Sequence, residues 1–524
     1  MELRQLAIYV KCQGDLVGKN FSVLIAGGGT AGWMAANLLA HRWRDFPVNI
    51  SLVESTEIGT IGVGEGSTPY LKSLFRALDI PESEWMPACD ATYKCGIRFP
   101  GWSTTPGYAA YYHPFYSPLD RETGAEFFLQ ADMRRRGILV DAQPDHFFHA
   151  PYLSSAGMAP IPKRPLPFEL DYAYHFDAGL LGRFLKSKAM QAGVRYRQVT
   201  IDRVRLRERG QGDVVIDSLT TASGEAIAAD FFIDCTGFRS SLLSELPEYQ
   251  FSSYEKTLLN NAAVALQMPG DSQVSLKSET VSEALTHGWM WNIPLQSRTG
   301  FGYVYGDAFI SPETAEQELR KRTGAPDGIS CRHLKMQVGR IEQHWSSNCL
   351  GVGLSQGFIE PLEATALMLV QFTIERFSLA FDPVNPHTSG ENQRSAFNHN
   401  INTMFDGVLD YVVAHYFLNT RNDTEYWRAA RHDIAVPERL QRLVDCWDRG
   451  DDFVEYLKQA GADKIYSHAS WYCLLAGMGR FPKGGAVGGG LESQQLLRDV
   501  QSFCGGNVAR FESHRRYLER LAAN

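Results

Sequence analysis

Residues 21–32 read FSVLIAGGGTAG, and their pattern is the strongest indication of the fold class. Its first six residues are apolar strand formers, and the glycine run is followed at once by WMAANLLAHRW, a segment of helical composition. A second strand-like run, NISLVE at 49–54, ends in an acid. Strand, glycine turn, helix and strand form a βαβ unit of the length that the dinucleotide fingerprint requires. The sequence therefore predicts an α/β protein built on a parallel, Rossmann-like sheet.

The glycine turn has the features of a pyrophosphate-binding loop. Gly27 permits the tight turn, Gly29 lets the backbone approach a pyrophosphate, and Gly32 lets the helix pack on the strand. The free amide N–H groups at the start of the helix, where Thr30 and Ala31 lie, would then meet the phosphates. We expect a dinucleotide here, and the alternative is a glycine turn that holds no cofactor.

Further segments favour FAD as that dinucleotide. Glu54 can accept hydrogen bonds from ribose hydroxyls, although a solvated strand-end acid would look the same. The segment IDCTGF at 233–238 resembles the second cofactor segment of two-dinucleotide-fold flavoproteins, and its alternative is an ordinary turn. The sequence contains no second GxGxxG unit for a nicotinamide cofactor, so we expect FAD to arrive already reduced by a separate flavin reductase. The remaining predicted cofactor-binding residues are Gly64, Asp234, Gly237 and Gly353.

Composition excludes several functional classes. Hydrophobic residues make up 44% of the 524 residues and charged residues 21%, which favours a globular protein. A formal charge of -8 without a basic run disfavours nucleic acid as a ligand. Nine scattered cysteines without zinc-like spacing favour reduced thiols and no metal site, as is typical of the cytoplasm. No run reaches the ~18 apolar residues of a membrane span, and the first twenty residues lack a signal peptide's apolar region.

The pattern divides the chain into three parts. Residues 1–20 are an N-terminal extension, and residues 21–390 form an FAD-binding module with inserted substrate loops. Residues 391–524 form a mainly helical substrate-binding region that we expect to pack on this module. Within the loops, the aromatic-rich stretch 101–168 is predicted to be irregular. The apolar-periodic segment GFIEPLEATALMLVQFTIERF is predicted to be a helix that Pro361 starts.

Three motifs in the sequence resemble those of one particular family. WMWNIP at 289–294 matches the WxWxIP signature of the flavin-dependent tryptophan halogenases. Lys94, within ATYKCGIRF, lies where that family keeps its essential lysine, and GFIEPLEATA at 357–366 resembles its halide-holding segment. The sequence resembles this family over nearly the whole chain after residue 20. Outside that resemblance, the same residues would be core tryptophans, a surface lysine and a proline-started core helix with an exposed glutamate.

The resemblance implies a specific chemistry. Reduced FAD and dioxygen would oxidise a halide ion, chloride or bromide, to hypohalous acid that travels inside the protein. Lys94 would hold or capture the halogen, and Glu363 would assist transfer or accept the ring proton. The halide would lie near the amides of Thr365 and Ala366. Ala364 and Ala366 depart from the family's commoner Ser-Thr-Gly pattern, which leaves the preference between chloride and bromide open.

An aromatic substrate site follows from the same resemblance. Trp289 and Trp291 share one face of an extended segment, so the two indoles can form a wall between the substrate and the flavin. His113 and Phe115 follow Lys94 at the family's spacing for side chains beside the substrate ring. We therefore expect an indole-like substrate.

The segment HYFLNTRNDTEYWR resembles the one that grips the amino-acid part of tryptophan, but it is altered. Asn422 stands where tryptophan-specific members place a glutamate, and His415 replaces a tyrosine. Loss of a charge-assisted contact to an ammonium disfavours free tryptophan and favours a neutral indole or a peptide-linked ring. The alternative for this segment is a surface helix with aromatic packing. Its predicted substrate-binding residues are His415, Tyr416, Asn422, Tyr426 and Trp427.

Two alternative functions remain open at this point. The first is a flavin-dependent aromatic monooxygenase, which needs neither the lysine nor the tryptophan wall. The second is a non-catalytic FAD-binding protein for electron transfer or sensing. The halogenase interpretation requires one channel that connects the cofactor's reactive ring to Lys94. The oligomeric state is not encoded in recognisable residues, and a homodimer is one arrangement that stays open.

Overall fold

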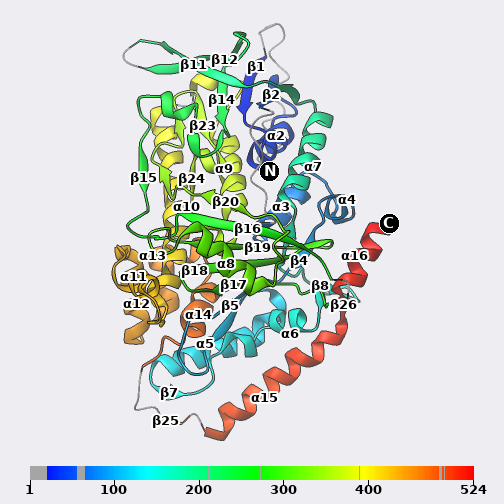
Figure 1. Cartoon of the computed structure of the whole chain (residues 1–524), viewed down its shortest axis with the longest axis vertical. Coiled ribbons are helices and arrows are strands. Elements are labelled where there is room, and N and C mark those ends of the chain that lie inside the picture. Colours follow the sequence, from blue (N-terminus) through cyan, green and yellow to red (C-terminus); the bar gives the residue numbers. More distant parts are fainter. Residues whose placement is uncertain are drawn as a thin grey trace, which may run out of the picture.

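The computed structural model describes residues 20–55, 65–210, 213–271, 273–388, 390–482, 487–488 and 490–523. Two sheets organise these residues, and the helices that follow residue 390 lie around them, with α11 to α13 (residues 425–460) at the left of Figure 1 and α15 and α16 (residues 490–523) at the lower right. The predicted extension at 1–20 and the predicted cofactor residue Gly64 lie outside the described residues, apart from Asn20.

The first sheet has six strands and is parallel, except where its last strand turns back. Its two central strands, β1 (Phe21–Ala26) and β14 (Phe231–Asp234), are buried on both faces, and Val23, Ile25 and Ile233 are almost completely inaccessible to solvent. Helices cover both faces of such a sheet, so a continuous apolar run is the expected strand pattern. The predicted α/β class with a parallel, Rossmann-like core is confirmed. In spatial order the strands are β10 (Arg195–Gln198), β2 (Val48–Glu54), β1 (Phe21–Ala26), β14 (Phe231–Asp234), β23 (Cys349–Gly351) and β22 (Trp345–Ser346).

Helix α2 (Thr30–Arg42) follows the glycine turn and is buried along most of its length. It packs against α7 (Ala178–Gln191) and α9 (Ala366–Ala380). The Asn37 side chain ties α2 to α7 by donating to the carbonyl of Leu185 at 2.8 Å. The start of α9 is therefore held close to the glycine turn, although more than 300 residues separate the two in sequence.

The second sheet has seven strands and carries the WMWNIP segment at its centre. Adjacent strands of this sheet are antiparallel, except for the parallel pair of β17 and β5. A small three-stranded sheet of β3 (Glu65–Gly66), β9 (Ala173–Phe176) and β4 (Thr92–Lys94) brings Lys94 to the same region. In spatial order the seven strands are β20 (Arg332–Lys335), β16 (Ala262–Pro269), β19 (Arg298–Tyr305), β18 (Gly288–Pro294), β17 (Thr280–Ala284), β5 (Gly96–Pro100) and β6 (Ala110–Pro114).

The segment 101–168 is not irregular, so that prediction is wrong. It contains β6, α5 (Arg121–Arg135), α6 (His149–Ser155) and β8 (Met158–Pro162). Aromatic contacts hold it together, and the rings of Phe127 and Phe148 are 5.2 Å apart at their centroids. Because these rings pack in three dimensions rather than at a regular helical spacing, the sequence pattern did not reveal the helices.

The chain after residue 390 is mainly helical, as predicted. Helix α14 packs against α5 and β6, and α16 packs against α4 and β8, while α15 runs along an edge of the molecule (Figure 1). None of the helices in the described ranges is long and apolar enough to cross a membrane. These helices are α10 (Glu391–Leu418), α11 (Glu425–His432), α12 (Glu438–Arg449), α13 (Phe453–Ala460), α14 (His468–Gly477), α15 (Gly490–Asn507) and α16 (His514–Ala523).

Smaller elements complete the described structure. They are α3 (Tyr70–Ala77), α4 (Glu82–Ala88), α8 (Pro312–Thr323), β7 (Ile138–Leu139), β11 (Ile201–Glu208), β12 (Val214–Thr221), β13 (Ala226–Ala228), β15 (Phe251–Ser253), β21 (Gly339–Ile341), β24 (Gly357–Phe358), β25 (Val487–Gly488) and β26 (Phe511–Ser513).

Candidate active site

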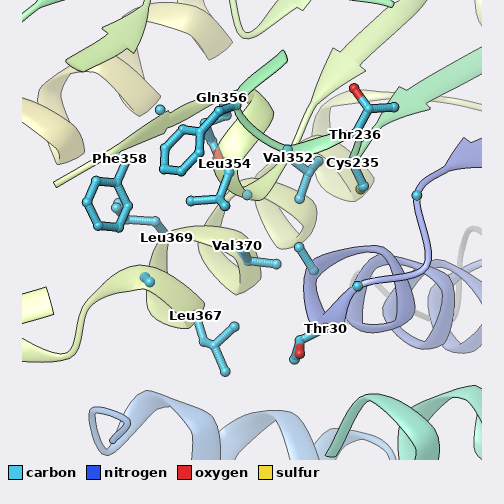
Figure 2. Close-up of a pocket in the computed structure, with 18 of the residues that line it drawn as sticks. Thr30, Cys235, Thr236, Val352, Leu354, Gln356, Phe358, Leu367, Leu369 and Val370 are labelled. Carbon is cyan, nitrogen blue, oxygen red and sulfur yellow. The ribbon is translucent and has the colours of Figure 1, made fainter. Parts of the chain in front are cut away.

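A cavity of about 880 Å³ is lined by both sheets. Residues 26–31 and 235–239 reach it from the parallel sheet, and Trp289, Trp291 and Val304 reach it from the seven-stranded sheet. Figure 2 shows the start of α2, the loop after β14 and the start of α9 around this space. The cavity is therefore large enough for an extended ligand that reaches from the glycine turn to the second sheet.

The glycine turn fits a phosphate-bearing ligand. Gly27 has φ +114°, and a Cβ there would lie 2.1 Å from the carbonyl oxygen of Cys235. A Cβ on Gly32 would lie 2.0 Å from the carbonyl oxygen of Gly27, so Gly32 lets α2 pack closely. Gly29 has no atom within 4 Å of its Cβ position, which leaves open space in front of the helix N-terminus. Thr30 and Ala31 also line the cavity.

Gly28 is a cavity residue that the motif analysis missed. A Cβ on Gly28 would lie 1.7 Å from an oxygen of Glu54, so only glycine lets this carboxylate approach the turn. Glu54 lines the cavity and accepts hydrogen bonds from Lys186 at 2.7 Å and from Tyr196 at 2.6 Å. Glycine is required at position 28 because the side chain of Glu54, at the end of the next strand, packs against the turn. The sequence alone carries no signal of this contact.

Asp234 lies behind the cavity rather than in its lining. Its side chain is fully buried and accepts hydrogen bonds from the backbone N–H groups of Leu242 and Leu243 at 2.8 and 3.0 Å. It also accepts from Thr236, and this fixes the loop that presents Gly237 to the cavity. Asp234 therefore stabilises the loop after β14 and does not itself line the cavity.

Gly353 lines the cavity between α2 and α9. It has φ +69°, and a Cβ there would lie 2.7 Å from the Cβ of Ala31. Glycine at this position lets the turn after β23 approach the first turn of α2.

Lys94 ends β4 and is completely buried. It lines the same cavity as the glycine turn, and its Nζ donates to the carbonyl of Ser67 at 3.1 Å. Its Nζ also lies 5.5 Å from the ring centroid of Phe115. Burial lowers the pKa of Lys94 to about 7, although the charge of Glu363 acts in the opposite direction. Near neutral pH both the ammonium and the amine forms of Lys94 are therefore populated. Because the side chain is buried, the alternative of a surface lysine is wrong.

The segment before α9 differs from the predicted helix. Pro361 starts a 3-10 turn that ends at Glu363, and Ala364 takes a left-handed conformation with φ +57°. Helix α9 begins only at Ala366, with Thr365 as its N-cap residue. The prediction that Pro361 starts the helix is therefore wrong, because the left-handed residue separates the two turns. Ala364 and Ala366 line the cavity, and Thr365 is buried beside it.

Glu363 is buried between two histidines. His113 Nδ1 lies 3.1 Å from one carboxylate oxygen, and His415 Nε2 lies 3.2 Å from the other. Burial by itself would raise the pKa of Glu363, but the two imidazoles outweigh burial and hold it at about 2. The carboxylate charge also acts on Lys94. A buried cation and a buried anion therefore lie within electrostatic reach of each other beside the cavity.

Trp289 and Trp291 lie next to each other on β18 and line the cavity. Their ring centroids are 6.2 Å apart, and the Trp289 Nε1 donates to Glu360 at 2.9 Å. A Cβ on Gly302 of the neighbouring strand would lie 2.0 Å from the Trp291 ring, so this glycine lets the indole lie across β19. The two indoles form an aromatic wall of the cavity.

Comparison with known proteins places this arrangement in a family. The tryptophan halogenase family model matches residues 22–487. The chain belongs to the tryptophan halogenase family. It is 37% identical over 451 residues to the tryptophan 6-halogenase SttH of Streptomyces toxytricini, covering 81% of this chain and 83% of that protein. This confirms the resemblance based on WMWNIP, Lys94 and GFIEPLEATA, and the protein is an FAD-dependent halogenase.

Solved structures agree with this assignment. BrvH, a flavin-dependent halogenase from Brevundimonas sp. BAL3, superposes with a TM-score of 0.80 at 29% identity, over 95% of this chain and 99% of that chain. MibH, described as a lanthipeptide tryptophan 5-halogenase, superposes with a TM-score of 0.82 at 27% identity, over 98% of this chain and 95% of that chain. The halogenase therefore shares the fold of these enzymes across almost its whole length.

The altered HYFLNTRNDTEYWR segment packs behind the cavity wall rather than lining it. Tyr416, Tyr426 and Trp427 are buried, and their polar atoms donate to Glu360, Asn260 and Leu285 respectively. The Asn422 side chain is exposed, and its oxygen accepts from Arg431. His415 faces Glu363. None of these five residues lines the cavity that the described residues enclose.

His113 and Phe115 lie beside Glu363 and Lys94 respectively, and neither lines the cavity that the described residues enclose. His113 contacts Glu363, and the half-buried Phe115 lies near the Lys94 ammonium. Glu360, which the sequence analysis did not select, joins Asn260, Trp289 and Tyr416 through one carboxylate oxygen. Only its place in the EPLE motif could have signalled Glu360, and nothing in the sequence marks Asn260.

Proposed function

We propose that this halogenase places chlorine or bromine on an electron-rich, indole-like ring that carries no free amino-acid ammonium, such as a neutral indole or a peptide-linked tryptophan. The observation that carries the activity is the burial of Lys94 in the cavity that the glycine turn also lines. The substrate preference rests on Asn422, whose exposed side chain pairs with Arg431. A tryptophan zwitterion then lacks a carboxylate partner for its ammonium at this position.

The residues present fit FAD. Gly29 and Gly237 have open space in front of their Cβ positions, and the N-terminus of α2 faces that space with free amide N–H groups. Glu54 is positioned to accept the ribose hydroxyls at the edge of the turn. When bound in its reduced form, FAD supplies with dioxygen the oxidising equivalents that convert halide into hypohalous acid. A separate flavin reductase provides the reduced FAD by diffusion.

The residues around Lys94 direct the halogen. The halide binds at the amide N–H groups of Thr365 and Ala366, where α9 begins and the helix dipole favours an anion. The indoles of Trp289 and Trp291 keep the substrate apart from the flavin. Lys94 holds hypohalous acid through its N–H groups, next to the ring of Phe115. Glu363 accepts the proton that the substrate ring loses.

The experiment that tests this function is a product assay with the full-length protein. The reaction contains FAD, a flavin reductase with its nicotinamide cofactor, air and either chloride or bromide. Indole, free tryptophan and a short tryptophan-containing peptide serve as substrates, and mass spectrometry detects the products. We expect a bromine isotope doublet, with higher kcat/KM for indole or the peptide than for free tryptophan.

Other outcomes of this assay would contradict the proposal. A gain of one oxygen without bromine would identify an aromatic monooxygenase. Absence of any product with all three substrates, in protein that binds FAD, would support the non-catalytic alternative. Higher kcat/KM for free tryptophan than for the other two would overturn the substrate preference while leaving the halogenase activity intact.

A further inference from the structure

Three elements that are distant in sequence place three titratable side chains in contact. His113 comes from β6, Glu363 from the 3-10 turn before α9, and His415 from α10. Their exposed fractions are 5%, 4% and 0%. His113 Nδ1 approaches one oxygen of Glu363 at 3.1 Å, and His415 Nε2 approaches the other at 3.2 Å. The carboxylate is therefore held from both sides.

The backbone of α10 fixes which nitrogen of His415 carries hydrogen. His415 Nδ1 lies 2.9 Å from the carbonyl oxygen of Tyr411, and a carbonyl can only accept, so Nδ1 must donate. In a neutral ring Nε2 then has a lone pair and no hydrogen. Nε2 makes no directed hydrogen bond to another described residue, and the charged atom that faces it is Glu363 Oε1.

This contact requires a proton at one of its two atoms. Two lone pairs 3.2 Å apart would repel each other, and burial removes the water that could separate or screen them. A proton on Nε2 turns the same contact into an attraction between an imidazolium and a carboxylate. His113 needs no additional proton, because a neutral imidazole can donate through Nδ1 to the other oxygen.

The surroundings of His415 hold the ring in this orientation. Aromatic rings pack on it, with centroid distances of 4.8 Å to Phe99, 5.7 Å to Trp102 and 5.4 Å to Tyr411. Lys94, on the cavity side, is the buried cation whose charge Glu363 influences.

We propose that His415 is a positioning residue that carries a proton at Nε2 and thereby holds Glu363, as a carboxylate, in the orientation required to accept the substrate's ring proton. This assignment rests on the proposed role of Glu363 in halogenation. It replaces the predicted substrate contact of His415 with a contact to the catalytic carboxylate. His415 therefore affects the rate of halogen transfer and does not affect substrate binding.

Two variants at position 415 separate this role from a packing role. His415→Gln keeps an amide N–H that can reach Glu363 but cannot titrate. His415→Phe keeps a ring and removes every donor. His432→Phe, on the exposed face of α11, is the matched control. Each variant is measured for FAD binding, melting temperature, substrate Kd, kcat and KM.

We expect His415→Phe to lower kcat about 20-fold or more with substrate Kd within about twofold of the unaltered enzyme, since one buried charged partner is lost. His415→Gln should recover most of that kcat, and His432→Phe should match the unaltered enzyme. Combined with Glu363→Gln, His415→Phe should cause no further loss of kcat beyond that of Glu363→Gln alone, because His415 acts through Glu363.

Other results would overturn the inference. A raised substrate Kd with unchanged kcat in His415→Phe would make His415 a substrate contact. Equal losses of kcat in the Gln and Phe variants, with melting temperatures preserved, would show that donation to Glu363 is irrelevant. Independent, multiplicative losses in the Glu363→Gln combination would separate His415 from Glu363. If the unaltered enzyme forms no halogenated product, the proposed function fails instead.

Discussion

The ammonium of Lys94 donates a hydrogen bond to the backbone carbonyl of Ser67 at 3.1 Å, and the lysine side chain is completely buried at the wall of the cavity. A fixed acceptor of this kind orients Nζ, and the low pKa keeps the amine available near neutral pH. Gly66, beside Ser67, leaves room for the ammonium, because a Cβ at position 66 would lie 3.3 Å from Nζ. The lysine is therefore positioned by backbone atoms rather than by a paired carboxylate.

Burial of Lys94 should reduce the stability of the folded protein. Its folded pKa of about 7 lies below the ordinary 10.5, so below pH 7 the folded state must hold a buried charge. Between these values the unfolded chain binds the extra proton, and stability contributed by this group rises with pH. We expect Lys94→Met to raise the apparent melting temperature by about 2 °C at pH 6 and by less at pH 9. Calorimetry at the two pH values checks this, and an equal change at both would contradict it.

The open space in front of Gly29 predicts that a substitution there lowers FAD affinity without changing the fold. Gly29→Ala adds a methyl group where nothing lies within 4 Å, so the fold should be unaffected. The methyl group would occupy the space into which the pyrophosphate must come, and we expect FAD affinity to fall about tenfold or more. Fluorescence titration of FAD, with the melting temperature of the FAD-free protein as control, tests this. Unchanged affinity would remove the glycine turn from the cofactor site.

The aromatic wall should separate substrate from flavin. Trp291→Ala opens the cavity beside Gly302, so hypohalous acid can leave before it reaches Lys94. We expect several-fold less halogenated product for each reduced FAD consumed, and more halogenation of a dye such as phenol red in solution. Trp345→Phe, at a buried tryptophan that does not line the cavity, is the control for lost aromatic packing. Unchanged product yield in Trp291→Ala would show that the wall is not a barrier.

Restoring a glutamate at position 422 should not by itself restore tryptophan recognition. The Asn422 side chain is exposed and its oxygen contacts Arg431, so a carboxylate there would pair with the same guanidinium. We expect Asn422→Glu to leave kcat/KM for free tryptophan within about twofold of the unaltered enzyme. A gain of tenfold or more would show that Arg431 does not occupy a carboxylate at position 422.

The βαβ core could be predicted because its determinants are local. Strand, glycine turn and helix are consecutive in FSVLIAGGGTAG, and Gly32 contacts the turn itself. The close approach of Gly27 to Cys235 is long-range and could not be predicted from the sequence. Lys94 could be placed beside the cavity only through the resemblance, since a short strand with one lysine has no distinctive pattern of its own.

The start of α9 and the role of His415 could not be predicted for different physical reasons. Ala364 adopts a left-handed conformation that alanine rarely takes, so no turn signal marks the break between Pro361 and Ala366. His415 meets Glu363 only because α10 packs against α9, and 52 residues separate the two side chains along the chain. Contacts of this range depend on tertiary packing rather than on spacing.

In the proposed function the halogen reaches the substrate through Lys94, which lines the same cavity as the glycine turn. The most direct test compares Lys94→Met with Lys321→Met, a change at an exposed lysine of α8, in the bromide assay with indole or a tryptophan-containing peptide. We predict that Lys94→Met binds FAD normally and forms at least about a thousandfold less brominated product, while Lys321→Met matches the unaltered enzyme. Brominated product from Lys94→Met at an undiminished rate would contradict the account.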